Sequence, residues 1–430
     1  ASWANPEMKT QNDMNQPAAA AVRQHRHPLV AQLSGRAIDE GDFWKRIEAA
    51  GAPLVEREGN DDHSLVTFVW QLSPQAEHAV TLSRLGEIAD NVMNQVRGTR
   101  VAHLTYRFRN DVRLSYGLVE DVPIVCERDA SKEELARFHE VLASTAPSAD
   151  PFNPDTFAMP GVGSAADRVL SLFALADAPD ESLIEKRAGI ARGWIETHQF
   201  ASRVLGNERT VWVQTPAQYN DSDASYGVVL LFDGGGYLSL VPTHRMLDNL
   251  SADGLISPVI GVFVDNATPT SRNTELPCNE KFAAFLREEL MPWLHESYRV
   301  SDDPALSAVA GSSFGGLASM WIGHELPDLF GNVISQAGSF WWGPGFESSL
   351  VHDDYQRGWL IDRFRQSPKR DIRIWLEIGL FETFGVPCNR EMRDALVDKG
   401  YDVSYREFCG GHDYALWRGT LAQALPCLLG

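Results

Sequence analysis

The residues best suited to catalysis lie in one short segment, 311–315, which reads Gly-Ser-Ser-Phe-Gly and forms a G-x-S-x-G pattern centred on Ser313. A short apolar run precedes it, and apolar residues with helical spacing follow it. A strand, a tight turn and a helix are the context of a nucleophile elbow, in which strained backbone presents a serine hydroxyl above a sheet. We expect a Cβ atom at Gly311 or Gly315 to collide with neighbouring backbone. The alternative is an ordinary strand-to-helix turn whose small residues only allow close packing.

A serine hydroxyl is a weak nucleophile at neutral pH and needs a base that a third group orients. His412 is the predicted base, because it lies in a glycine-flanked loop after the last predicted strand. The acid should follow the preceding strand, 372–379, where two carboxylates compete. Glu382 lies in the loop after that strand and is preferred, whereas Glu377 lies within the strand and is the alternative. Asp413 is next to the base in sequence and is expected to point away from it.

A tetrahedral intermediate also needs N–H donors for its oxyanion. The backbone N–H of Phe314, directly after the nucleophile, is the first predicted donor. The second should come from the loop after the apolar run 228–232, where Asp233 is followed by three glycines, and we expect Gly235 to supply it. Without a nucleophile at Ser313, the same segment would be a plain glycine turn.

The elements that position these residues alternate in type from residue 205 onward. The segment 279–298 predicts a long helix that Pro292 kinks. Strands alternating with helices predict a doubly wound α/β sheet, with its ligand site at the carboxyl ends of the strands. The predicted strands are 210–215, 228–232, 259–265, 308–310, 332–339, 372–379 and 403–408.

The chain before residue 205 has a different pattern of predicted secondary structure. Residues 1–35 are polar and alanine-rich, and we expect a disordered lead in which His25-Arg26-His27 is a solvated tail rather than a metal site. Residues 36–125 predict a small β-sandwich-like domain with one short helix around Phe43. Residues 126–204 are expected to be a linker region that contains a helix at 131–142. The strands expected in the sandwich are 65–70, 80–85, 101–108 and 112–119.

Composition narrows the class of protein. A chain of 430 residues with 44% hydrophobic residues suits two globular domains, and no apolar run of about 18 residues occurs, so no membrane span is predicted. A net charge of −20 argues against a nucleic-acid partner, because a phosphate backbone needs a basic face. The start shows no signal pattern, and the five cysteines are widely spaced, so reduced thiols and a cytoplasmic location are expected.

Four segments together resemble the enterochelin (ferric enterobactin) esterases, within the esterase D-like branch of the α/β hydrolases. They are E-L-P-C-N at 275–279, G-S-S-F-G-G at 311–316, S-Q-A-G-S-F-W-W at 335–342 and G-G-H-D at 410–413. The likeness covers 205–430 strongly.

A less specific likeness to the family's N-terminal domain and linker lies at 65–70, 103–116 and 150–154. The Asp233 loop departs from the family in being richer in glycine, which leaves the second oxyanion donor open.

The resemblance implies an α/β-hydrolase domain that hydrolyses the trilactone of a ferric catecholate siderophore in the cytoplasm, so that iron is released. It implies no metal or other cofactor for catalysis, since iron enters with the substrate. On this view Arg272 meets catecholate or carbonyl oxygens, and Trp341 and Trp342 stack on catechol rings. The alternatives are a loop-surface role for the arginine and core packing for at least one tryptophan.

Two other functions stay open. One is an esterase D-like hydrolase acting on a different ester, such as a feruloyl ester or a thioester. The other is a siderophore-binding protein without catalysis, against which the complete set of serine, histidine and acid counts. We expect the N-terminal domain to close over one side of the pocket, because the substrate is large. The sequence leaves the oligomeric state open.

Overall fold

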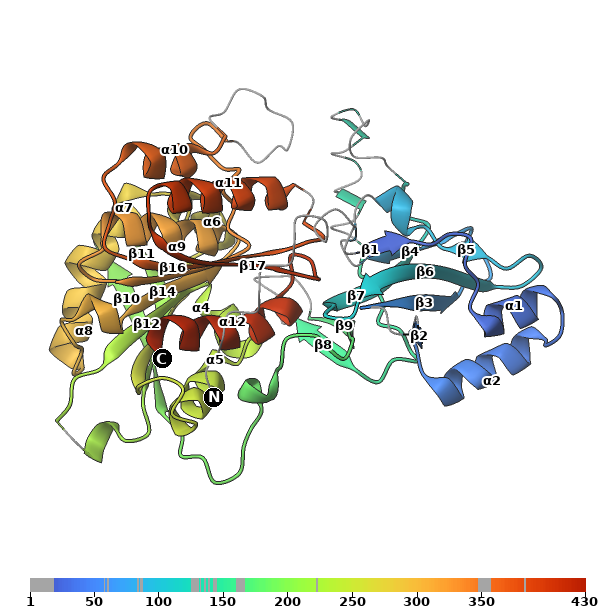
Figure 1. Ribbon diagram of the computed structural model, residues 1–430, viewed down its shortest axis with the longest axis horizontal. Coiled ribbons are helices and arrows are strands. Elements are labelled where there is room, and N and C mark those ends of the chain that lie inside the picture. Colours follow the sequence, from blue (N-terminus) through green and yellow to red (C-terminus); the bar gives the residue numbers. More distant parts are fainter. Residues whose placement is uncertain are drawn as a thin grey trace. The chain divides into compact units, whose positions relative to one another are not determined.

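The chain forms two compact units in a computed structural model (Figure 1). Unit 1 comprises the chain up to Val112 with Tyr116–Thr156 and Phe173–Ala178, and unit 2 comprises Arg113–Ser115, Phe157–Leu172 and Pro179–Gly430. The units are thus interleaved along the chain. The structure describes residues 19–430 except 58, 60–61, 83–84, 86–87, 125–130, 132, 135–136, 138–139, 142–144, 160–166, 222, 347–356 and 383.

The N-terminal part of the chain builds two sheets. In the five-stranded sheet the order is β1-β6-β3-β2, with β5 pairing β6, and the four-stranded sheet has the order β4-β7-β9-β8. The strands of the first sheet are β1 Ala19–Ala21, β2 Leu54–Arg57, β3 His63–Gln71, β5 Asn94–Gln95 and β6 Val101–Arg109. Those of the second are β4 Ala79–Leu82, β7 Arg113–Glu120, β8 Thr156–Met159 and β9 Arg168–Ala174.

Aromatic side chains of unit 1 join the two sheets. The ring centroids of Phe68 on β3 and Tyr116 on β7 are 4.8 Å apart, and those of Phe108 on β6 and Phe173 on β9 are 6.1 Å apart. Aromatic contacts of this kind, edge-on for the first pair and tilted for the second, add to the burial of apolar area. The predicted β-rich, sandwich-like N-terminal domain is therefore confirmed.

The lead is more ordered than predicted where the structure describes it. Residues Pro28–Ser34 form helix α1, which the prediction of a disordered 1–35 missed, while residues 1–18 lie outside the described part. The signals were local: the His27 side chain accepts a hydrogen bond from the N–H of Leu29, and Pro28 occupies the first turn. Apolar residues of α1 then pack on helix α2, Glu40–Ala50, which is the short helix predicted around Phe43.

The region predicted as a linker, 126–204, also contains regular structure. It supplies β8, β9 and strand β10, Trp194–Ser202, and β10 pairs antiparallel with β11, Asn207–Thr215, so the large sheet begins before residue 205. The sequence analysis did not predict β10, because it is an edge strand whose side chains are mostly exposed and polar and so lacks an apolar pattern. The helix predicted at 131–142 lies largely outside the described residues.

Unit 2 is built on an eight-stranded sheet with the order β10-β11-β13-β12-β14-β15-β16-β17. From β13 onward neighbouring strands are parallel, and β10 and β11 form an antiparallel edge. The parallel strands are β12 Gly227–Phe232, β13 Val259–Val264, β14 Ala308–Ser312, β15 Asn332–Gln336, β16 Arg373–Gly379 and β17 Asp402–Phe408. The predicted doubly wound α/β-hydrolase sheet is thus confirmed.

The winding direction reverses between β12 and β14. The chain runs from β12 outward to β13, returns to β14 on the other side of β12, and then continues through β15 to β17. In open α/β sheets, ligands bind beyond the carboxyl ends of the strands at such a reversal. The loops after β12 and β14, which carry Gly235 and Ser313, leave the sheet at this point.

Helices cover both faces of the sheet (Figure 1). Alternate residues of β12 face the two sides, with Leu230 in one core cluster and Leu231 in the other. One layer consists of α4 Gly234–Ser239, α5 Thr243–Ala252 and α12 Tyr414–Leu429. The other consists of α6 Pro269–Glu275, α7 Glu280–Phe285, α8 Met291–Ser297, α9 Phe314–Glu325, α10 Trp359–Gln366 and α11 Gly385–Asp398.

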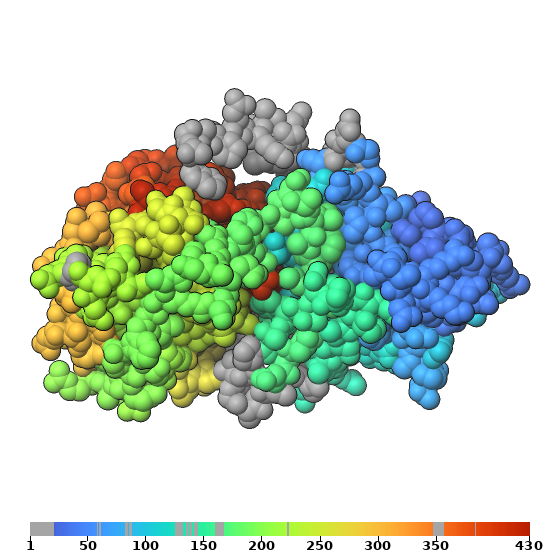
Figure 2. All heavy atoms as spheres, turned by 90° about the horizontal axis from the view of Figure 1, so that it is seen from below, coloured from blue at the N-terminus to red at the C-terminus, as the bar shows by residue number. Residues whose placement is uncertain are grey.

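The helix predicted over 279–298 is interrupted, as expected from Pro292. Helices α7 and α8 are joined by a π-helical turn, η5, at Leu286–Leu290. The proline has no N–H for the ladder, so the hydrogen bonds of the preceding turn are rearranged. The ring centroid of Trp293 on α8 lies 5.4 Å from that of Phe200 on β10. In Figure 2, where colour follows residue number, green and orange atoms of unit 2 lie next to each other on the face drawn.

The remaining short helices are 3-10 turns, and they lie between the longer elements. They are η2 Ile88–Asn91, η3 Ser182–Ile184, η4 Tyr219–Asp221 and η6 Pro304–Leu306. Within the described part of the chain, every helix is too short or too polar to cross a membrane.

Candidate active site

Ser313 sits at the turn between β14 and α9 in a backbone conformation that L residues rarely adopt, with φ 59° and ψ −121°. Two backbone hydrogen bonds tie this residue to the end of β15 and to the loop after it. The Ser313 N–H donates to the Gln336 carbonyl at 2.9 Å, and the Ser313 carbonyl accepts from the Ser339 N–H at 3.2 Å. Strained residues persist only where the surroundings enforce the conformation, and they cluster at functional sites. The geometry is that of the predicted elbow, and Ser313 is partly exposed.

The two glycines of the pattern play different roles. A Cβ on Gly311 would lie 2.6 Å from the backbone carbon of Gly315, so a side chain there is excluded. A Cβ on Gly315 would meet its nearest neighbours, Asp233 and Phe232, at 3.4 and 3.5 Å, which is ordinary contact. The expectation of a collision is therefore correct for Gly311 and wrong for Gly315. At Gly316 a Cβ would lie 2.8 Å from the Ser335 hydroxyl oxygen, because the turn packs against β15.

His412 and Glu382 lie on neighbouring loops and are in contact. The Nδ1 atom of His412 is 2.6 Å from Oε2 of Glu382, and the side chains are 27% and 12% exposed. The loops are joined by a backbone hydrogen bond from the Phe381 N–H to the Gly410 carbonyl at 2.9 Å. Such close approach needs Gly379 at the end of β16, where a Cβ would lie 2.5 Å from the Gly410 carbonyl oxygen.

Glu377 faces the interior instead. Its carboxylate accepts hydrogen bonds from Trp375 Nε1 at 2.7 Å, from Gln336 Nε2 at 2.9 Å and from the Thr420 hydroxyl. Burial raises the pKa of Glu377 to about 7, although these hydrogen bonds act in the opposite direction. Of the two carboxylates left open by sequence, the structure brings Glu382 to the histidine and places Glu377 in a buried network.

The buried network connects the serine turn to the histidine. Gln336, whose carbonyl accepts from Ser313, donates through its side-chain Nε2 to the backbone carbonyl of Trp417 at 3.1 Å. The ring of Trp417 packs edge-on against the imidazole of His412 at 4.9 Å. Asp413 points away from the site as expected, because its side chain caps α12 by accepting from the Ala415 N–H at 2.9 Å.

The two predicted oxyanion donors differ in the structure. Phe314 is the first residue of α9, where backbone N–H groups have no partner within the helix. Gly235 lies beside Asp265, because a Cβ built on this glycine would be 3.3 Å from Asp265 Oδ2. The role of the Gly235 N–H as the second oxyanion donor stays a prediction. Its predicted loop is the start of α4, with Asp233 in the left-handed conformation before it.

Arg272 lies on α6 and forms a two-point ion pair with Asp233. Its Nε and Nη2 atoms donate to the two carboxylate oxygens at 2.7 and 2.8 Å. The guanidinium carbon also lies 5.8 Å from the centre of the Phe314 ring. Arg272 is thus beside the elbow, with part of its donor capacity used within the protein, and its contact with a substrate stays a prediction.

The two tryptophans after β15 have different surroundings. Trp341 contacts Phe314 at 5.8 Å between ring centroids, whereas Trp342 packs against the core of the helical layer and contacts Trp359 at 6.4 Å. Trp341 also contacts Phe346 and Phe384, at 4.9 and 5.9 Å. The expectation that one tryptophan belongs to the core is met by Trp342.

Sequence reasoning missed part of this aromatic group. Phe384 is 49% exposed and has the Arg357 guanidinium 5.6 Å from its ring centre. An aromatic residue two places after Glu382, in a loop at a strand end, was the available signal. Trp417 was also missed, and its signal was a large residue one helical turn after His412.

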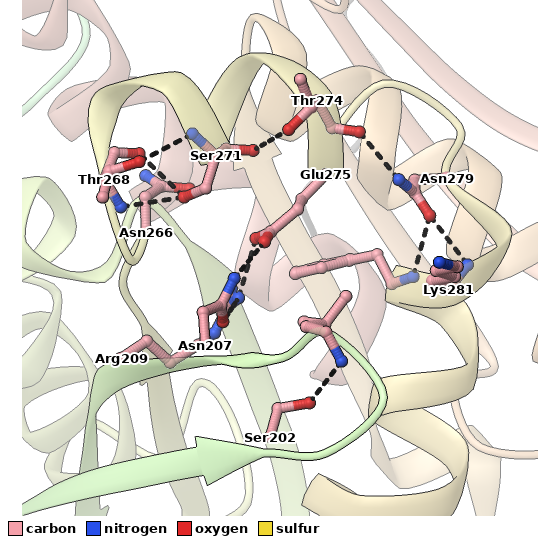
Figure 3. Close-up of polar contacts among 12 residues, drawn as sticks. Ser202, Asn207, Arg209, Asn266, Thr268, Ser271, Thr274, Glu275, Asn279 and Lys281 are labelled. Carbon is pink, nitrogen blue, oxygen red and sulfur yellow. Dashed lines mark hydrogen bonds and ion pairs between the residues drawn. The ribbon is translucent and has the colours of Figure 1, made fainter.

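The E-L-P-C-N segment supports α6 rather than entering the site. Figure 3 shows Glu275 reaching β11, where its carboxylate accepts from Asn207 at 2.6 Å and from Arg209 at 2.8 Å. The pair of Arg209 and Glu275 is almost fully buried, so losing one partner would leave an uncompensated charge. Asn279 caps α7 and donates to the Thr274 carbonyl at 2.8 Å. These contacts fix the helix that carries Arg272.

Comparison with known proteins agrees with this geometry. The family described as "Putative esterase" matches residues 202–428, more than half of the chain, and the family described as "Enterochelin esterase, N-terminal" matches residues 65–183. The iron(III) enterobactin esterase of Dickeya dadantii is 27% identical, over 92% of this chain and 94% of the relative. The iron(III) salmochelin esterase of Escherichia coli O6:H1 is 28% identical, over 96% and 98%.

Solved structures show the same similarity. The ferric enterobactin esterase of Salmonella typhimurium matches with a TM-score of 0.74 and 25% identity, over 90% of this chain and 98% of that one. The enterobactin esterase of Shigella flexneri, crystallised in the presence of enterobactin, matches with a TM-score of 0.71 and 26% identity, over 91% and 98%. The chain is thus a member of the enterochelin esterase family, with an N-terminal enterochelin esterase domain followed by an esterase domain of the α/β-hydrolase fold.

Proposed function

We propose that the protein is a serine esterase that hydrolyses the trilactone backbone of a ferric catecholate siderophore such as enterobactin. The observation that carries the proposal is the contact between Glu382 and His412 at the edge of the sheet where Ser313 occupies a strained elbow. The names of the relatives, which act on iron(III) enterobactin and iron(III) salmochelin, support the choice of substrate.

The mechanism uses three side chains of unit 2. Glu382 accepts a hydrogen bond from the Nδ1–H group of His412, so the unprotonated Nε2 atom is the base that takes the hydroxyl proton of Ser313. The serine oxygen attacks an ester carbonyl, and the Phe314 N–H stabilises the resulting oxyanion. Collapse expels the alcohol oxygen of the next serine unit, which takes the proton from His412. Water then hydrolyses the acyl-enzyme by the same route and leaves a carboxylate. No step requires a metal, because the iron is part of the substrate.

Aromatic and cationic groups beside Ser313 suit the substrate. The rings of Phe314, Trp341 and Phe384 form a contiguous group, and Arg272 and Arg357 lie over its two ends. A ferric tris-catecholate presents three aromatic rings and three negative charges, so ring stacking and guanidinium contacts can act together. A protein of net charge −20 needs such local positive charge to bind an anion.

We further propose that the enzyme acts in the cytoplasm. Support comes from Cys278, Cys388 and Cys427, which are free thiols, as is usual in a reducing compartment. Cys126 lies outside the described residues. Closure of the N-terminal domain over the pocket stays a prediction.

Chromatographic analysis of ferric enterobactin incubated with wild type, Ser313→Ala and Ser312→Ala tests the proposal. We expect linear dihydroxybenzoylserine products from wild type and from Ser312→Ala, and none from Ser313→Ala. Ser312 is the matched control, because it is the neighbouring serine and its side chain is buried.

The same assay distinguishes the other functions. Cleavage of simple aryl esters without cleavage of the siderophore would move the substrate to another ester. Tight binding of the ferric complex without any hydrolysis would indicate a binding protein, and normal turnover by Ser313→Ala would refute the mechanism.

A further inference from the structure

A basic cavity in unit 1 lies outside the site described above. Its volume is about 360 Å³, and its lining includes Arg23, Arg26, Arg97 and His103 with the amides of Asn94 and Gln95. Among the described residues, no carboxylate lines it. Among the residues that the structure describes, these three arginines have no acidic partner, which is unexpected in a chain of net charge −20.

The guanidinium of Arg23 is held in place by neutral acceptors. Its Nη2 atom donates to the carbonyls of Ala89 and Asp90 at 2.8 and 3.1 Å, and its Nη1 atom donates to the Val92 carbonyl at 3.3 Å. Backbone carbonyls orient the group without neutralising its charge. Arg23 is therefore pre-positioned for an anion, which reduces the entropy lost on binding.

Arg26 and Arg97 add charge that the protein itself does not compensate. In the part of the chain that the structure describes, neither forms an ion pair or a hydrogen bond, and both are exposed at the cavity. Guanidinium groups bind carboxylates and phosphates through paired N–H donors, and several around one cavity act on the same ligand.

His103 supplies a buried and unsatisfied polar atom. The residue lies on β6 opposite Asn94 of β5 and is only 4% exposed, and its Nδ1 atom has no hydrogen-bond partner among the described residues. Buried polar atoms are nearly always satisfied, and an exception needs an explanation. Burial, followed by the charges of Arg26 and His25, lowers the pKa of His103 to about 4, so the free ring is neutral and can donate from Nδ1 to an anionic ligand.

The neighbouring histidines do not make this a metal site. His25 is hydrogen-bonded to Glu56 at 2.7 Å through Nε2, and Nδ1 of His27 accepts from the N–H of Leu29 at 3.2 Å. The expectation of a solvated tail at 25–27 is also wrong, because His25 and His27 have defined partners and Arg26 lines the cavity.

We propose that this cavity of unit 1 binds the oxyanion group of a small organic ligand, a carboxylate or a phosphate. The cavity volume exceeds that of a single ion, since a water molecule takes up about 30 Å³ of liquid. The ligand's oxyanion contacts Arg23, Arg26 and Arg97 and accepts a hydrogen bond from His103. This binding function is additional to ester hydrolysis in unit 2.

Isothermal titration calorimetry on the full chain tests the proposal with inorganic phosphate and with 2,3-dihydroxybenzoylserine as probes. The variant Arg26→Gln/Arg97→Gln removes two of the cavity charges. The control Arg46→Gln/Arg100→Gln removes the same charge from exposed positions of unit 1 elsewhere. Circular dichroism spectra identical to that of wild type establish that both variants are folded.

We expect at least one probe to bind wild type and the control variant alike, with affinity reduced at least about tenfold by Arg26→Gln/Arg97→Gln. Binding of the carboxylate probe alone identifies a carboxylate site, and binding of phosphate alone identifies a phosphate site. Because the carboxylate probe can also occupy the catalytic site, only the part of its binding that is sensitive to the variant counts. Absence of binding of both probes at millimolar concentration, or equal affinity in all three proteins, would overturn the proposal.

Discussion

Two carboxylates five residues apart, Glu377 and Glu382, have opposite environments. Glu377 lies inside β16, where its buried carboxylate accepts hydrogen bonds from three side chains of the interior. Glu382 lies in the loop beyond the strand and contacts His412. Trp341 and Trp342 show the same division, since Trp341 lies beside the elbow and Trp342 is partly buried and packs against the core. The comparison teaches that position relative to the end of a strand, not residue type, assigns a side chain to the site or to its support.

The largest expected effect is on catalysis by the loop carboxylate. Glu382→Gln should lower kcat by about 10³-fold, because an amide neither stabilises the imidazolium nor enforces the Nδ1–H tautomer of His412. Steady-state kinetics with an ester substrate measure the change. The control is Asp413→Asn, which keeps a side chain able to cap α12 and should leave kcat within about twofold. A variant at Glu382 that is as active as this control would remove the distinction between the two carboxylates.

The interior carboxylate should affect stability instead. The pKa of Glu377 is raised to about 7 in the folded protein, so the unfolded state loses this proton at lower pH than the folded state. The stabilisation is present below the unfolded value of about 4.5 and is lost as pH rises through about 7, which corresponds to about 3 kcal/mol.

Urea unfolding at pH 5 and pH 8 measures this contribution. Wild type should lose about 3 kcal/mol more stability than Glu377→Gln between the two pH values, because the amide does not ionise. Equal pH dependence of the two proteins would mean that Glu377 is ionised without cost in the core.

A substitution at Gly379, where β16 ends, should disturb the close packing of the Glu382 loop against the His412 loop. Gly379→Ala places a methyl group 2.5 Å from the Gly410 carbonyl oxygen, so the acid loop and the histidine loop must move apart. We expect a loss of about 2 kcal/mol in stability and a decrease in kcat of about tenfold or more. Gly315→Ala, where the added Cβ has normal contacts, should change stability by less than about 1 kcal/mol. Thermal unfolding that ranks the two variants in reverse would contradict the packing described here.

The smallest expected effects are those of replacing Trp341 and Trp342, which should differ in kind. Trp341→Ala should raise KM for the ferric siderophore about fivefold with little change in stability, because its ring contributes about 1 kcal/mol of stacking. Trp342→Ala should leave KM nearly unchanged and lower the unfolding free energy by about 2 kcal/mol, because its ring packs in the core. Kinetics and urea unfolding of both variants test this, and a shared effect on KM would mean that both rings contact the substrate.

The sequence by itself determined the local features of this protein. The glycine-bounded serine, the apolar runs of β12 and β13 and the loop histidine have signatures that depend only on residue type and spacing. The α/β sheet, the turn at Ser313 and the loop positions of His412 and Glu382 were therefore predictable, while their catalytic roles stay predictions. These signals are local because strand and turn preferences act over a few residues.

Only the tertiary structure decided which partners these residues have. That Arg272 pairs with Asp233 and that Glu275 pairs with Arg209 depend on segments far apart in the chain. The basic cavity is likewise assembled from β6, β5 and the turn before α1. Such contacts carry no pattern in sequence, because they arise from the packing of whole elements and not from the preferences of neighbouring residues.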